Sequence, residues 1–143
     1  MSARPPLSAP EALVCTMVLV AAADGGMTDR EIGVMAGVVQ TLPAFRDFTA
    51  DHLETATDQA VRLLREEEGL QHAGRLIRAA LSPRLRETAY ALACEVVAAD
   101  LVHQGPTLDM LEFVRAELNL DPLIAAAIER GARARHTRAE PGK

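Results

Sequence analysis

The residues of this chain best suited to chemistry are acidic side chains beside an apolar segment. Asp24 directly follows the apolar run at residues 12–23, and Glu31 lies where a second helix is expected to begin. Because only a short loop separates them, their oxygens could meet at one place, with Asp29 as a further donor. Carboxylate and carbonyl oxygens are the ligands that calcium and magnesium prefer. The pattern therefore predicts a weak site for a divalent cation.

Ordinary helix-end chemistry also accounts for these residues. An aspartate before a glycine, as in Asp24-Gly25, commonly bonds the backbone of a turn. Thr28 and Glu31 match a capping box, in which each side chain satisfies the backbone amide of the other residue. An EF-hand is excluded, because the twelfth position counted from Asp24 is Met35, where a glutamate is required. A metal site and a purely structural role both remain open.

The hydrophobic pattern predicts an all-α fold of about seven helices. Turn and capping signals place these helices at about residues 9–23, 28–42, 50–67, 70–81, 83–100, 107–118 and from 122 into the C-terminal tail. The first is apolar nearly all round, which is typical of a central, buried helix. Ser82-Pro83 and Asp121-Pro122 are N-cap and proline pairs that start helices, and Thr107 is expected to cap the sixth helix.

Three side chains carry separate expectations. Phe45 and Phe48 lie in a connector between helices, and we expect them to plug the core. Glu95 falls on one helical stripe with Arg84 and Glu87, which predicts that it faces solvent.

An internal repeat relates the two halves of the chain. A shift of 76 residues places 20–24 over 96–100 and 28–31 over 104–107, and it places Met35, Val38 and Leu42 over Leu111, Val114 and Leu118. Each unit is a long apolar helix ending in aspartate, a short loop and an amphipathic helix. We therefore predict a pseudo-two-fold arrangement with the first and fifth helices as the core pair. That arrangement would bring Asp100 toward Asp24 and Glu31.

The residues that define the repeat resemble the TerB-like tellurite resistance family. Residues 19–25 followed by Glu31 look like its first unit, in which an apolar helix ends in Ala-Asp-Gly and a glutamate opens the next helix. Residues 98–121 resemble its second unit, and the likeness extends over residues 9–128. The resemblance implies about seven helices with pseudo-two-fold symmetry. It also implies a bacterial, non-enzymatic protein linked to tellurite resistance and stress responses.

The resemblance further implies that Asp24, Glu31 and Asp100 bind a divalent metal, with calcium, magnesium and zinc as the candidates. Leu101 and Thr107 stand where the second unit would have its glycine and glutamate, so support for Asp100 is weaker. Partners implied by the resemblance are other proteins of a stress-response complex at the inner membrane face. A metal-free adaptor for protein–protein interaction is the alternative, and a homodimer stays open.

Composition and charge narrow the classes of partner. The net charge is −5, and residues 130–143 hold five basic residues and one acidic residue, so the remaining residues carry −9. An acidic body repels phosphate backbones, which argues against a nucleic-acid partner. No histidine, cysteine or glycine-rich motif has the spacing of a catalytic or nucleotide site, so we expect no enzyme activity.

The apolar run at residues 12–23 is too short to span a bilayer, so no transmembrane segment is expected. Its likeness to a signal peptide is opposed by Glu11 beside it and by the helix start at Ser8-Ala9-Pro10. Cys15 and Cys94 lie in apolar segments, which suits the reducing cytoplasm. We expect a flexible arm at residues 1–8, one helical domain at residues 9–129 and a disordered basic tail at residues 130–143.

Overall fold

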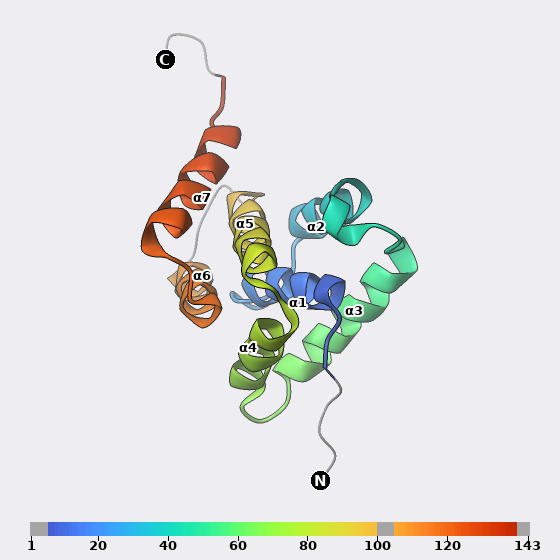
Figure 1. Ribbon diagram of the computed structural model, residues 1–143. Helices are drawn as coiled ribbons and strands as arrows, with labels where there is room; N and C mark the ends of the chain where they lie inside the picture. The colour runs from blue at the N-terminus through green and yellow to red at the C-terminus, as the bar shows by residue number, and fades with distance from the viewer. Residues whose placement is uncertain (1–5, 100–104, 140–143) are drawn as a thin grey trace.

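A computed structural model describes residues 6–99 and 105–139 of the chain (Figure 1). That part is all-helical and has no strand, as predicted. It holds seven α-helices and one short 3-10 helix: α1 (Ala9–Ala21), α2 (Asp29–Thr41), η1 (Pro43–Phe45), α3 (Ala50–Leu64), α4 (Gly69–Ala80), α5 (Pro83–Ala99), α6 (Gly105–Leu118) and α7 (Pro122–Arg135).

Helix α1 is the central element, with α2–α6 packed around it and α7 packed on α5 (Figure 1). Every residue from Ala12 to Ala21 is buried. Burying one aliphatic side chain of this kind stabilises a fold by about 1.5–3 kcal/mol. Thr16, its one buried polar side chain, is satisfied because its hydroxyl donates to the carbonyl of Ala12 at 2.8 Å. The all-round apolar sequence of this helix follows from its surroundings, because no face of it meets water.

The described helices pack as two related halves. α1 and α5 form the most extensive helix pair, α3 covers α1 as α7 covers α5, and α2 lies on α5 while α6 lies on α1. α2 (Asp29–Thr41) and α6 (Gly105–Leu118) overlap along their length under the 76-residue shift of the repeat. α3 and α7 begin 72 residues apart, because η1 lengthens the connection in the first half. The predicted pseudo-two-fold arrangement therefore holds for helices α1–α3 and α5–α7.

Helix α4 has no counterpart in the second half among the described residues. It packs against α1, α3 and α6, beneath the central helix in the view of Figure 1. Its start is tight, because Glu68 adopts a left-handed backbone with φ of 55° and a Cβ on Gly69 would lie 2.1 Å from the carbonyl oxygen of Leu63. Only glycine fits at position 69.

Several predicted helix ends were wrong by a few residues. α1 ends at Ala21, two residues early, and α3 ends at Leu64, where the chain tightens toward Glu68. α6 begins at Gly105, so Thr107 lies buried within its first turn and is not the N-cap. α7 is helical to Arg135, so the part of the expected tail at residues 130–135 is ordered helix.

The prediction for Phe45 and Phe48 is confirmed, whereas the prediction for Glu95 was wrong. Phe45 is buried and packs against Phe48 with ring centroids 5.6 Å apart, which confirms the expected plug. Glu95 does not face solvent, since its side chain is only 14% exposed. α7 folds across this part of α5 and brings Arg135 and His136 onto the Glu95 carboxylate.

Candidate functional site

The α1–α2 loop holds two of the three predicted metal ligands. After Ala21 the chain turns, and the amide of Gly25 donates to the carbonyl of Ala22 at 3.2 Å. Gly25 has a φ of 117°, which glycine adopts without strain. Asp24 precedes it and is exposed to solvent. The glycine turn therefore leaves the Asp24 carboxylate at the surface.

Glu31 is the buried member of the pair, with 3% of its surface exposed. Its Oε1 accepts a hydrogen bond from the amide of Thr28 at 2.7 Å, and its own amide donates to Thr28 Oγ1 at 3.1 Å. The predicted capping box is confirmed. The positive end of the helix dipole further favours a carboxylate at this position.

The third predicted ligand, Asp100, lies outside the described residues. Within residues 6–99 and 105–139, no three His, Cys, Asp or Glu side chains are grouped to hold a metal ion. Asp24 and Glu31 lie at the two ends of one loop, and all donors there are oxygens. Such a donor set fits calcium or magnesium, whereas zinc sites are built mainly from nitrogen and sulfur.

A buried polar cluster between α5 and α7 was missed by the sequence reasoning. Tyr90 is 1% exposed, and its hydroxyl donates to Glu129 at 2.5 Å. Burial, followed by this bond to Glu129, raises the pKa of Tyr90 above its usual range. Burial also raises the pKa of the neighbouring Cys94 thiol to about 12, and the negative charge of Glu129 adds to the effect. Both groups therefore stay protonated near neutral pH.

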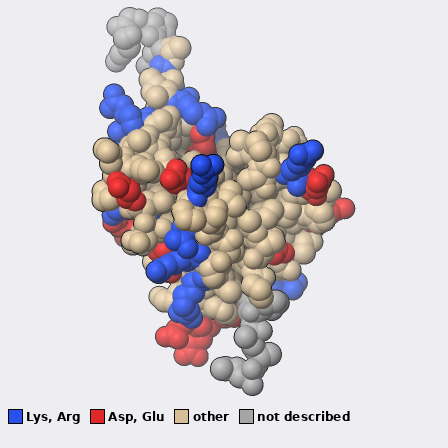
Figure 2. All heavy atoms as spheres, viewed as in Figure 1, with Lys and Arg blue, Asp and Glu red and all other residues tan. Residues whose placement is uncertain are grey.

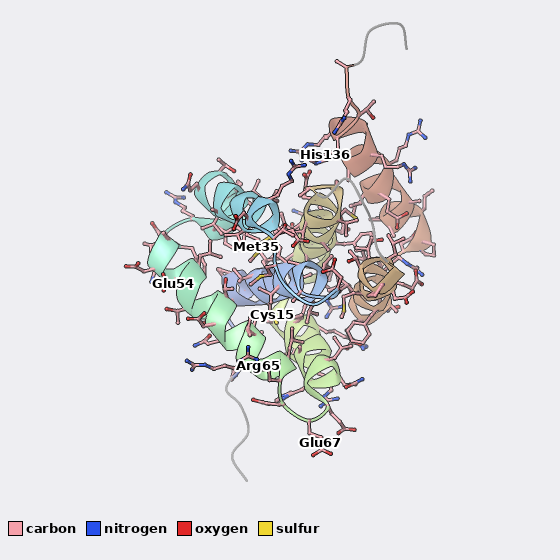
Figure 3. The ribbon with its side chains drawn as sticks, turned by 180° about the vertical axis from the view of Figure 1, so that it is seen from behind. Cys15, Met35, Glu54, Arg65, Glu67 and His136 are labelled. Atoms are coloured by element: carbon pink, nitrogen blue, oxygen red, sulfur yellow. The ribbon has the colours of Figure 1, made fainter. Side chains whose placement is uncertain are left out.

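A second missed contact fixes the end of α7. Glu95 is bound by the Arg135 guanidinium through Oε1 and by His136 Nε2, which lies 2.7 Å from Oε2. Figure 3 shows His136 at the far end of the molecule from Glu67, which precedes α4. Glu95 and Arg135 are 40 residues apart in the sequence. No local spacing could reveal the pair.

A groove with an apolar floor runs between α5, α6 and α7, with a volume of about 610 Å³. Val97, Leu108 and Leu111 line its floor, and Arg133 and His136 lie at its edge. Figure 2 shows basic side chains, with acidic ones among them, over the α7 side of the molecule. The groove combines apolar surface with the charged side chains of Arg133 and Glu129, and its thiol, Cys94, is held protonated by burial.

Comparison with known proteins identifies one family. Residues 10–130 match the family model described as tellurite resistance protein TerB. No curated protein and no solved structure matches the chain. Among the described helices, none is both long and apolar enough to cross a membrane.

Proposed function

The chain belongs to the TerB family of tellurite resistance proteins, and from that premise we propose that it acts as a non-catalytic module that binds a divalent cation at the α1–α2 loop. Burial holds the Cys94 thiol protonated, which speaks against a thiol nucleophile at that position, since the thiolate and not the thiol is the nucleophile. The reducing interior of a bacterial cell is the compartment that suits its two buried cysteines, which form no disulfide.

The observation that carries the cation proposal is the placement of Glu31. Its carboxylate is buried at the start of α2 and oriented by the amide of Thr28, while Asp24 stands at the other end of the same loop. Metal-ligating carboxylates are typically hydrogen-bonded in this way, because the outer bond fixes their direction. Asp100 would join them if the two-fold relation extends past α5. Loop carbonyls and waters would complete the six to eight oxygens that calcium takes.

A metal-titrated melting curve tests this proposal. A ligand that binds only the folded state at 100 times its Kd stabilises it by about 2.7 kcal/mol. We therefore expect millimolar calcium or magnesium to raise the Tm of the metal-free protein by several degrees. Asp24→Asn should abolish the rise while leaving the Tm in EDTA unchanged, because Asp24 is exposed.

The matched control is Glu67→Gln, an exposed carboxylate in the connection between α3 and α4 whose loss should leave the metal response intact. An equal Tm in millimolar metal and in EDTA for the wild-type protein would refute the cation site. A metal response that survives Asp24→Asn would move the site elsewhere.

A protein-binding adaptor is the second candidate, favoured by exposed apolar side chains on the second half. Leu108 is 49% exposed and Leu123 is 79% exposed, and Leu108 lines the groove between α5, α6 and α7. Substitution of Leu108 by Asp should release a protein that co-purifies with the wild-type chain, at unchanged Tm. Retention of that protein by the variant would exclude this groove as its binding site.

A further inference from the structure

Helix α4 packs closely against a surface formed by α1 and α6, which we call the α4 seat. Gly74 and Ile77 of α4 meet Leu19 of α1 and the α6 residues Phe113, Val114, Glu117 and Leu118. A Cβ on Gly74 would lie 3.2 Å from the ring of Phe113 and 2.9 Å from the Glu117 carboxyl carbon. The small residue on α4 therefore makes room for the large residue on α6.

The 76-residue repeat predicts an equivalent seat between α5 and α2. The seat residues Leu19, Phe113, Val114, Glu117 and Leu118 correspond to Glu95, Gly37, Val38, Thr41 and Leu42. All five of these counterparts line one groove of about 560 Å³ between α2 and α5, which we call the α2–α5 groove. Figure 2 shows the molecule notched at this place, above α1 in the view of Figure 1.

The neighbouring helices correspond as well. α4 is held by α1, α3 and α6, whose two-fold counterparts are α5, α7 and α2. Residues of all three counterparts line the α2–α5 groove: Val34 and Val38 from α2, Thr88 and Leu92 from α5, and Arg135 from α7. No described helix fills it.

We infer that the α2–α5 groove is a docking site for one amphipathic helix of a partner protein, which would pack there as α4 packs on α1 and α6. The inference rests on the adaptor candidate above and names a different surface and the form of the partner. It is carried by α4 itself, which shows within the same chain what such a seat holds. Recognition of an amphipathic helix through anchors one and two turns apart is a recurring mode of binding.

The residues that differ between the two seats define the side chains the partner should present. Gly37 replaces Phe113, and a Cβ on Gly37 would meet nothing within 4 Å. A large apolar residue should therefore oppose Gly37, where α4 has Gly74 opposing Phe113. Val38 and Leu42 supply the apolar floor, while Thr41 and Glu95 make the rim more polar than that of the α4 seat.

A size-swap experiment with a defined peptide tests the inference. The probe is a fluorescent peptide of residues 69–81, held helical by a staple between positions 75 and 79, which are exposed on α4. Two versions are titrated with the full chain in EDTA: the native peptide and one carrying Gly74→Phe. Because burying one phenyl ring is worth about tenfold or more in affinity, the wild-type chain should prefer the Gly74→Phe peptide by at least about that factor. Gly37→Phe should reverse the preference.

The matched control is Gly33→Phe, one turn earlier on α2, exposed and with open space around it but absent from the groove lining. It should behave as wild type, and the melting curves of all three chains should confirm that they fold. The inference is overturned if neither peptide binds at millimolar concentration, or if Gly37→Phe leaves the preference unchanged. Because EDTA is present, these outcomes are independent of the cation site, and partner release by Leu108→Asp separately reports on the other groove.

Discussion

Alkaline pH should destabilise this protein through Cys94, and Cys94→Ala should remove that part of the sensitivity. The thiol is buried on α5, and its pKa is raised from 9.0 to about 12 because burial penalises the thiolate. In the unfolded chain the thiol ionises from about pH 9, whereas the folded protein keeps its proton. The folded state then binds more protons than the unfolded state, so stability falls as pH rises from about 9 to 12.

The size of the effect follows from the shift. For each pH unit over which the thiol is ionised in the unfolded chain but protonated in the folded protein, the unfolding free energy falls by about 1.4 kcal/mol. Between pH 7.5 and pH 10 the thiol therefore lowers the unfolding free energy by about 1.4 kcal/mol. For a domain of this length that corresponds to about 4 °C in Tm. Tyr90, whose pKa is raised in the same direction by burial, adds its own loss only above pH 10, where an unfolded tyrosine ionises.

The assay is thermal melting of wild type and Cys94→Ala, with a reductant, at intervals from pH 7.5 to pH 10. Truncation of the side chain lowers the Tm of the variant at every pH, but that packing cost does not depend on pH. The wild-type Tm should therefore drop about 4 °C more than that of the variant across the range. Parallel pH profiles would refute the argument that burial raises the pKa of Cys94.

Three further substitutions test the start of α4 and the contact between α5 and α7. Gly69→Ala should lower the unfolding free energy, measured by urea titration, by about 2 kcal/mol or more, because its Cβ would collide with the Leu63 carbonyl. The control Gly131→Ala, in open space on α7, should raise the unfolding free energy by about 0.5–1 kcal/mol. Equal effects of the two substitutions would disprove the clash at position 69. Glu95→Gln should cost about 1 kcal/mol or less and speed amide exchange in the last turn of α7, which loses its ion pair with Arg135; unchanged exchange there would show that this contact does not fix the helix.

Local patterns were enough to predict the elements and the core. Each capping or proline signal acts within one turn, so Ser8, Thr28 and Asp121 were found as N-caps from sequence alone. The apolar run of α1 and the repeat together predicted the central helix and its partner α5. The prediction of Thr107 as an N-cap was wrong, because the chain is already helical at Gly105 and Thr107 is buried within α6.

Long-range contacts could not be predicted in the same way. Tyr90 with Glu129 and Glu95 with Arg135 join α5 to α7 across about forty residues, and the stripe of α5 alone suggested that Glu95 faced water. The orientation of α7 decides these contacts, and no spacing within α5 encodes it. The candidate cation site shows the same limit, because Asp24 and Glu31 were placed on one loop by local signals, while the approach of Asp100 depends on the packing of the second half.

The divergence of the two halves argues that the α2–α5 groove is kept open by its sequence. A seat that merely lost its helix would leave apolar surface in water, and larger side chains could fill it at little cost. Here the seat keeps Val38 and Leu42 half-buried on its floor, while Gly37 and Thr41 are small and Glu95 is neutralised by α7. These substitutions reduce exposed apolar area yet preserve the concave shape. A surface of that kind remains soluble alone and can still accept a helix, which is the combination that an adaptor requires.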